Sequence, residues 1–234
     1  TLQEAIDLVN GLDYGLTSGI QSLDEAERDL WKNSIQAGNL YINRGITGAI
    51  VNRQPFGGMK LSAFGGGIKA GGPNYCAQFT YITDKKGSKT DYRKSYAEAW
   101  EKEFRHARDW NKCHGEQNVF RYLPVKGGMC LRLFKDDSNE QAQMIALAAK
   151  TAGTPLTISF DPTDDRTQSL AQTGATLKKE SLGDFLTSMP RYERIRTCSA
   201  DIPKEMYQRA ADTNKYIATA PPVKDGRVEL IHYI

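Results

Sequence analysis

The chain has 234 residues, 39% of them hydrophobic and 25% charged, a composition typical of water-soluble globular proteins. A net charge of +3 gives no indication of a nucleic-acid-binding surface, and no apolar run approaches the ~20 residues needed for a transmembrane segment. The four cysteines show neither a CxxC pair nor a metal-ligand spacing, so we expect reduced thiols in a cytoplasmic protein.

The first part of the chain alternates helices and strands. Thr1 and Glu4 have the spacing of a capping box, and Ser22 and Glu25 repeat it. The second box would place Leu23 on the apolar face of its helix. The predicted elements are a helix over residues 1–10, a strand over residues 14–21, a helix from residue 22 that ends at Gly38, and a strand over residues 40–43. This order predicts an α/β layer.

The segment from Asn43 to Gly58 is the most informative part of the sequence. It holds four glycines, a proline, a phenylalanine and two arginines, Arg44 and Arg53. Glycines permit positive φ, and consecutive free N–H groups in such a loop can form a concave anion site. One interpretation is the wall of a pocket for a carboxylate, with the arginines as candidate partners. The alternative is an irregular connection, with glycines at ordinary turns and arginines that form salt bridges or are solvated.

The middle of the chain contains the expected domain boundary. Residues 79–83 alternate in polarity and predict a strand, and the polar stretch over residues 84–92 follows it. We expect a charged helix over residues 95–113, in which Tyr96, Phe104 and other aromatic residues form a stripe. Such a stripe is more typical of core packing than of a cofactor site.

From Met129 onward, strands and helices alternate regularly. The predicted strands cover residues 129–134, 156–160, 175–178, 194–199, 216–220 and 228–233, and the predicted helices cover residues 138–152, 168–173, 183–189 and 203–213. In the first of the predicted helices, over residues 138–152, the residues expected to face the core are Ala142, Ile145, Ala146 and Ala149. This alternation predicts a parallel, doubly wound sheet with right-handed crossovers.

A dinucleotide site in such a sheet would need a glycine-rich turn after its first strand. The segment from Lys135 to Glu140 contains no glycine and carries three acidic residues, which would repel a phosphate. We therefore expect a Rossmann-like domain without a nucleotide site, in which Ser138 or Asp137 caps the following helix.

Two stretches of sequence resemble those of a known family. The run Pro-Phe-Gly-Gly-Met-Lys-Leu-Ser, which ends at Ser62, resembles the aldehyde dehydrogenase superfamily. The Ile-Thr-Gly-Ala stretch that ends at Ala49 and the Lys-Ala-Gly-Gly-Pro-Asn-Tyr stretch that ends at Tyr75 are narrower. They resemble the L-glutamate γ-semialdehyde (1-pyrroline-5-carboxylate) dehydrogenase half of bifunctional proline utilisation A. Residues 1–82 carry most of the likeness, and residues from about 115 resemble the extra C-terminal domain of the longer members.

The resemblance implies the NAD-dependent oxidation of L-glutamate γ-semialdehyde to glutamate, by an enzyme that also uses FAD if it is fused to proline dehydrogenase. Gly48 and Ala49 match the family's substrate-carboxylate loop, and Phe56 matches an aromatic ring that packs against the aliphatic stem of the substrate. No catalytic, cofactor-binding or metal-binding residue is matched. The catalytic cysteine, the general base and the nucleotide-binding segment would precede Thr1, so the isolated chain is expected to be inactive.

The expected partners are the remainder of the parent polypeptide, a small-molecule substrate and further copies of the same chain, the last through the strand over residues 79–83. The alternative is a structural module for oligomerisation or channel sealing, with no chemistry of its own. The tail after Gly226 resembles a family tail that continues further, so we also expect a truncated C-terminus.

The expected organisation has three parts. Residues 1–83 would be the C-terminal part of an aldehyde dehydrogenase catalytic domain, residues 84–114 a linker with the aromatic helix, and residues 115–234 a Rossmann-like accessory domain. Lys60 and Ser62 are expected to hold the glycine-rich loop. Ala63 stands where the resemblance leads us to expect glycine, and it would carry strain if that position needs φ > 0.

Overall fold

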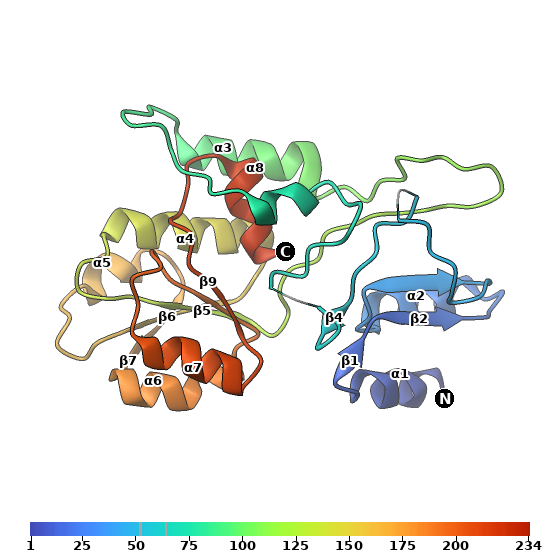
Figure 1. The fold of residues 1–234 in the computed structure, drawn as a ribbon, viewed down its shortest axis with the longest axis horizontal. Coiled ribbons are helices and arrows are strands. Elements are labelled where there is room, and N and C mark those ends of the chain that lie inside the picture. Colours follow the sequence, from blue (N-terminus) through green and yellow to red (C-terminus); the bar gives the residue numbers. More distant parts are fainter. Residues whose placement is uncertain (52, 64) are drawn as a thin grey trace. The chain divides into compact units, whose positions relative to one another are not determined.

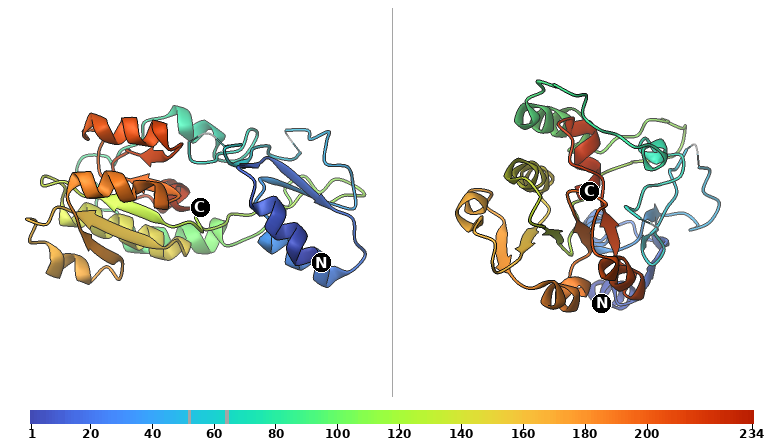
Figure 2. Two further views of the ribbon diagram at one scale, coloured as in Figure 1. Left: turned by 90° about the horizontal axis from the view of Figure 1, so that it is seen from below. Right: turned by 60° about the vertical axis from the view of Figure 1, so that its left-hand side comes forward.

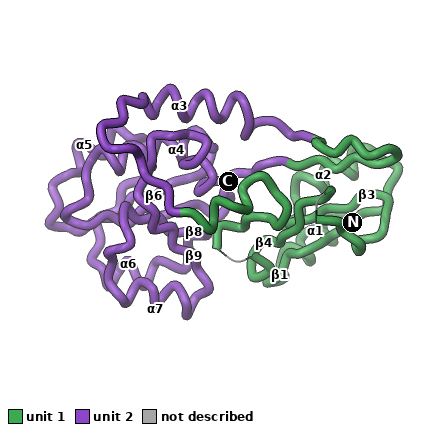
Figure 3. Tube along the Cα trace, turned by 45° about the horizontal axis from the view of Figure 1, so that its top comes forward, with its two compact units in different colours: residues 1–80, 109–120 green, residues 81–108, 121–234 purple. Residues whose placement is uncertain are grey.

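The chain divides into two units that interleave in sequence. Residues 1–80 and 109–120 form unit 1, and residues 81–108 and 121–234 form unit 2 (Figure 3). The structure, a computed structural model, describes residues 1–51, 53–63 and 65–234. These units are compact parts of the structure and do not test the domain boundaries expected at residues 83 and 114, which stay predictions.

Unit 1 is built from short strands and two helices (Figure 1). Its elements are α1 (Leu2–Asn10), β1 (Tyr14–Gly15), β2 (Thr17–Ile20), α2 (Glu25–Ser34), β3 (Asn39–Ile42), β4 (Met59–Lys60) and a 3₁₀ helix (Tyr75–Phe79). β2 pairs in parallel with β3, and β1 pairs antiparallel with β4. Ile6, Trp31 and Ile35 form a small core between the helices and the strands. The capping box of Thr1 and Glu4 is confirmed at the start of α1.

The predicted start and end of α2 are wrong. Asp24, not Ser22, caps the helix, because its carboxylate accepts the backbone N–H groups of the first turn. Leu23 precedes the helix and is 92% exposed, so it contributes nothing to the apolar face. The helix also ends at Ser34, before Gly38 is reached.

The strand predicted over residues 79–83 is also absent. The 3₁₀ helix ends at Phe79, and no regular element follows it until residue 92. Phe79 and Tyr81 are 73% and 78% exposed. Alternating polarity predicts a strand only where a neighbouring strand can satisfy its backbone groups, and no described strand pairs with this segment.

Unit 2 contains the predicted doubly wound sheet. Its strands are β5 (Met129–Arg132), β6 (Leu156–Phe160), β7 (Thr176–Lys179), β8 (Arg194–Arg196) and β9 (Tyr216–Ala218). They lie in the order β7-β6-β5-β8-β9, and every neighbouring pair is parallel. Helices α4 (Asn139–Ala152) and α5 (Thr167–Ala171) lie on one side of the sheet, and α6 (Leu182–Ser188) and α7 (Lys204–Asp212) lie on the other (Figures 1 and 2). The α/β class and the parallel sheet are thus confirmed.

Helix α4 illustrates how local sequence determines this unit. Ser138 caps it in a capping box with Gln141, and Gly153 ends it in the left-handed conformation at φ 72°. The four residues expected to face inward are all buried, and they pack in the main core of the unit: Ala142, Ile145, Ala146 and Ala149.

The aromatic helix is shorter than predicted. Helix α3 (Tyr92–Ala99) continues as a π-helical turn that ends at Phe104, and residues 109–120 then belong to unit 1. Tyr96 and Phe104 are buried in the core, as expected for a packing stripe. Trp110 is 46% exposed and lies against Phe120, with 5.3 Å between the ring centroids.

The C-terminal strand predicted over residues 228–233 is instead helical. Helix α8 (Gly226–Glu229) begins at Asp225, whose carboxylate accepts two backbone N–H groups, and a 3₁₀ turn (Leu230–Tyr233) follows it. A helical turn places Glu229 and Tyr233 side by side, and the Tyr233 hydroxyl donates to Glu229 Oε1 over 2.7 Å. The same oxygen lies 3.1 Å from Nη2 of Arg196, and the side chains of this ion pair are fully buried. The buried pair therefore fixes the end of the chain onto the end of β8.

Candidate functional site

The glycine-rich loop of unit 1 begins directly after β3. Asn43 has a φ of 57°, and its side-chain amide exchanges two hydrogen bonds with the backbone of Ser22, at 2.9 and 3.0 Å. Asparagine tolerates the left-handed region better than most residues. The first residue of the loop is therefore fixed to the turn between β2 and α2.

Gly48 and Ala49 present two adjacent backbone donors. Gly48 has a φ of 81°, and no atom lies within 4 Å of a β-carbon built there, so glycine is required for conformation and not for space. Within residues 1–51, 53–63 and 65–234, the N–H groups of Gly48 and Ala49 donate no hydrogen bond. Beyond them, the carbonyl oxygen of Ile50 accepts the N–H groups of Arg53 and Gln54 at 2.8 Å each. The loop is thus held just after two adjacent donors that have no acceptor in the described part of the chain.

Phe56 is positioned by its backbone. Its N–H and carbonyl groups both pair with Ala70, at 3.0 and 2.9 Å. The side-chain amide of Asn39 binds the residues on either side, Pro55 through its carbonyl oxygen and Gly57 through its N–H, at 3.1 Å each. Among the described residues, no hydrogen bond joins Phe56 to the pair of donors at Gly48 and Ala49. The structure places the three predicted substrate residues on one loop, with the aromatic ring and the donors supported separately.

Lys69 is a part of the site that the sequence did not reveal. Its ammonium group donates to the carbonyl oxygens of Gly57 and Gly38, at 2.5 and 2.6 Å, and to Oδ1 of Asn39 at 3.2 Å. Burial lowers the pKa of Lys69 to about 8. Within the described ranges no carboxylate forms an ion pair with it. Lys69 is therefore a cation that joins the start of β3 to the segment carrying Phe56.

The other residues of the family-like run also hold backbone. The Lys60 ammonium donates to the carbonyl oxygens of Asn10 and Leu12, at 2.5 and 2.7 Å. The Ser62 hydroxyl accepts the N–H of Gly15 at 3.2 Å. The strain expected at Ala63 is absent, because the position of positive φ in this run is Lys60, at 53°.

The two arginines that flank the loop differ. The Arg44 guanidinium forms an ion pair with Glu116 at 3.0 Å and lies over the ring of Tyr41, so the salt-bridge alternative applies to it. Arg53 is exposed and has no side-chain partner among the described residues. Arg44 is therefore occupied by the protein itself.

In unit 2, the turn after β5 is held by a side chain. Arg166 donates to the carbonyl oxygens of Phe134 and Asp137, at 2.7 and 2.5 Å, and pairs with Asp164. The Asp137 carboxylate accepts the N–H of Phe134 at 2.8 Å. In a doubly wound sheet a ligand binds outside the carboxyl ends of the strands, where the backbone N–H groups of such a turn contact it. Here the turn is closed by contacts within the protein.

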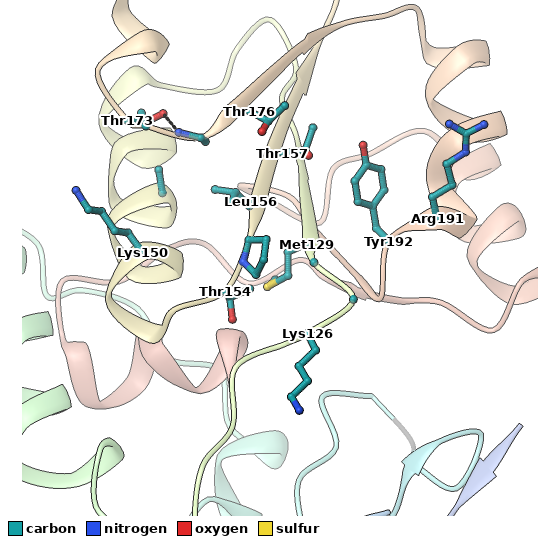
Figure 4. Close-up of a pocket in the computed structure, with 16 residues that line it drawn as sticks. Lys126, Met129, Lys150, Thr154, Leu156, Thr157, Thr173, Thr176, Arg191 and Tyr192 are labelled. Carbon is teal, nitrogen blue, oxygen red and sulfur yellow. Dashed lines mark hydrogen bonds between the residues drawn. The ribbon is translucent and has the colours of Figure 1, made fainter. Parts of the chain in front are cut away.

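A cavity of about 600 Å³ lies at the opposite, amino-terminal ends of the strands. It opens where β5, β6 and β7 begin, and it is lined by residues that include Thr157, Thr176 and Tyr192. Three cationic side chains border it, Lys126, Lys150 and Arg191, and they extend away from one another (Figure 4). Because the cations do not converge, we assign this cavity no ligand.

In the described part of the chain, no group of three His, Cys, Asp or Glu residues has the arrangement of a metal site. No helix described is sufficiently long and apolar to cross a membrane.

The part of the chain that contains the glycine-rich loop is similar to known proteins. Residues 1–84 match the model of the aldehyde dehydrogenase family. The 1-pyrroline-5-carboxylate dehydrogenase of Geobacillus kaustophilus is 46% identical over 71 residues, which are 30% of this chain and 13% of that protein. The 1-pyrroline-5-carboxylate dehydrogenase 2 of Bacillus subtilis is 45% identical over 74 residues, covering 32% of this chain and 14% of that protein.

One solved structure is similar over the whole chain. Proline Utilization A (PutA) from Corynebacterium freiburgense superposes with a TM-score of 0.74 at 35% identity, covering 100% of this chain and 23% of that one. The chain thus spans less than a quarter of each of these three relatives. Residues 1–84 of the chain belong to the aldehyde dehydrogenase family.

Proposed function

We propose that the chain is the C-terminal part of an NAD-dependent L-glutamate γ-semialdehyde dehydrogenase, which oxidises the semialdehyde to glutamate in proline catabolism. The names of the relatives that match residues in its first third support this substrate. The similarity to PutA over the full length supports a parent polypeptide that is longer than this chain. If that polypeptide is fused to proline dehydrogenase, it also uses FAD.

The role of this chain is to hold the substrate, and one observation carries that role. The adjacent N–H groups of Gly48 and Ala49, which have no partner among the described residues, form a pair of donors for the carboxylate at the amino-acid end of the semialdehyde. Hydrogen bonds to a charged acceptor are roughly twice as strong as neutral ones. The ring of Phe56 packs against the aliphatic stem. Both contacts contribute orientation, which lowers the barrier without chemical participation.

The chemical step belongs to the rest of the parent enzyme. Aldehyde oxidation needs a nucleophile and a hydride acceptor, and the second of these is NAD. Burial raises the pKa of the Cys130 and Cys198 thiols to about 12 each, so neither is a thiolate at neutral pH. None of the four cysteines lies in the nucleophile motif that the family resemblance implies, so the proposal assigns the catalytic cysteine and the NAD site to the rest of a cytoplasmic parent polypeptide.

A structural role is the second candidate. Phe79 and Tyr81 are largely exposed aromatic residues on a segment whose backbone pairs with no described strand. A contiguous patch of exposed apolar residues is a feature of protein–protein interfaces. A homo-oligomer contact through this segment is compatible with the enzymatic role.

The full-length protein tests the proposal directly. Purified enzyme should form NADH from NAD⁺ and L-glutamate γ-semialdehyde with a higher kcat/KM than from an aldehyde of equal length that lacks the carboxylate. Equal values for the two aldehydes would refute the anchoring role, and no NADH from the semialdehyde would refute the activity.

A further inference from the structure

A segment from outside the family match contacts the glycine-rich loop. Residues 109–120, here called the strap, lie beyond the aldehyde dehydrogenase match, which ends at residue 84. The chain enters unit 1 at residue 109 and leaves it after residue 120, so both ends of the strap continue into unit 2. Unit 1, which carries the candidate site, therefore includes one segment from beyond the family match.

Three polar contacts join the strap to the loop. Glu116 pairs with Arg44 at 3.0 Å, and the Asn111 side chain donates to the carbonyl oxygen of Arg53 at 2.5 Å. In the third, Nε2 of Gln54 donates to Oδ1 of Asn118 at 2.8 Å. These partners are separated by 58 to 72 residues in sequence. The contacts reach both the first residue after Asn43 and the last residues before Pro55.

The strap has its own internal support. The Asp109 carboxylate accepts the backbone N–H groups of Asn118, Lys112 and Asn111, at 3.0 to 3.1 Å. These hydrogen bonds hold the pKa of Asp109 below its usual value, and the one from the Asn118 N–H has the largest effect. The rings of Trp110 and Phe120 lie against each other near the two ends. The strap is thus a closed loop that presents Glu116 and Asn118 in defined positions.

Gln54 connects the strap to the two donors. Its Oε1 accepts the N–H of Ile50 at 3.4 Å, while its Nε2 donates to Asn118. Ile50 directly follows Ala49, so the Gln54 amide holds the peptide that comes immediately after the two candidate anchor N–H groups. Without Asn118, this amide is free to rotate away from Ile50.

We propose that the strap is a positioning element, in which Asn118 and Glu116 hold the loop so that the N–H groups of Gly48 and Ala49 are set for a carboxylate. This inference rests on the proposed function of the loop. It adds that selectivity for a carboxylate-bearing aldehyde depends on residues outside the family match.

The kinetic test uses Asn118→Ala and Glu116→Gln in the full-length enzyme, with Gln117→Ala as the matched control. Gln117 is exposed and has no hydrogen-bond partner among the described residues. Each strap variant should raise KM for the semialdehyde about 2- to 10-fold, the range expected for one lost hydrogen bond, with kcat changed much less. Neither the control nor the oxidation of an aldehyde without a carboxylate should be affected. Equal losses on both aldehydes would overturn the proposal.

A double-mutant cycle separates the strap from a general effect on folding. If Asn118 acts through Gln54, then Asn118→Ala should add nothing to KM once Gln54→Ala is present. Fully additive effects of the two substitutions would contradict the proposed coupling.

Hydrogen exchange tests the strap without any substrate. The amides of Arg53 and Gln54, which bond to Ile50, should exchange faster in Asn118→Ala than in the wild type or in Gln117→Ala. Unchanged exchange would overturn the positioning role even if the enzyme oxidises the semialdehyde. Faster exchange in a protein with no activity on the semialdehyde would instead reject the proposed function and retain the strap.

Discussion

The ammonium group of Lys69 donates a 2.5 Å hydrogen bond to the carbonyl oxygen of Gly57, the residue that follows Phe56. A second bond from the same group reaches the carbonyl oxygen of Gly38, at the start of β3. One partly buried cation therefore joins the strand that leads into the loop to the segment that leaves it.

Replacement of Lys69 by methionine should destabilise unit 1. Methionine has a similar length but no donor, so the carbonyl oxygens of Gly38 and Gly57 would lose a partner, at a cost of about 1–3 kcal/mol. The midpoint of chemical denaturation measures this loss of stability, and Lys86→Met, at an exposed position, is the control. Equal midpoints for the two variants would show that Lys69 does not join the segments.

The titration of Lys69 should be visible in stability. Its pKa is about 8 in the folded protein and about 10.4 in an unfolded chain, so the unfolded state binds more protons between these values. The free energy of unfolding of the wild type, relative to that of Lys69→Met, should therefore rise as pH increases from 8 to 10. A relative stability that falls over this window would mean that the folded protein raises the pKa of Lys69 instead.

A methyl group at Gly38 should disrupt the same contact. A β-carbon there would lie 1.9 Å from the carbonyl oxygen of Gly57. That oxygen is held by the Lys69 ammonium, and the N–H of Gly57 is held by Asn39, so the residue has little room to move. We expect Gly38→Ala to destabilise by about 1–3 kcal/mol, as for overpacking of a tight contact. Gly45→Ala is the matched control, because nothing lies within 4 Å of its β-carbon. Thermal unfolding of both variants checks the difference, and similar losses would contradict it.

Removal of the Glu229 carboxylate should destabilise unit 2. Burial opposes its ionisation, yet the Arg196 guanidinium holds the pKa of Glu229 below its usual value. Glu229→Ala would leave Arg196 buried without a counter-ion, which typically costs about 3–5 kcal/mol. Denaturant unfolding monitored by circular dichroism gives the value, with the exposed Glu205→Ala as control. A loss below about 1 kcal/mol would indicate that Arg196 is accessible to water.

The sequence predicted the sheet of unit 2 because its signals are local. Ser138 and Gly153 mark the two ends of α4, and the strands are short apolar runs between such markers. The segment after Asp225 defeated this approach, because a short apolar run fits a strand and a helix equally well. Its conformation is decided by Arg196, which lies 33 residues before Glu229 and binds it.

The candidate site shows the same division. The glycines and Phe56 are visible in sequence because the special backbone of the loop requires particular residue types. Lys69 is not, because its acceptors are backbone carbonyls 12 and 31 residues away, and any residue supplies a carbonyl. The strap is equally hidden, since Asn118 meets Gln54 across 64 residues of chain.

The most direct measurement of the carboxylate anchor is the kinetics of a full-length Ala49→Leu enzyme. A larger side chain would crowd the space beside the N–H groups of Gly48 and Ala49. Loss of one charge-assisted hydrogen bond costs about 1.5–3 kcal/mol, or roughly 10- to 150-fold in kcat/KM. We predict a loss of this size for L-glutamate γ-semialdehyde and a much smaller one for an aldehyde of similar length without the carboxylate. Equal losses would show damage to the fold, and no loss on either substrate would show that the carboxylate is held elsewhere.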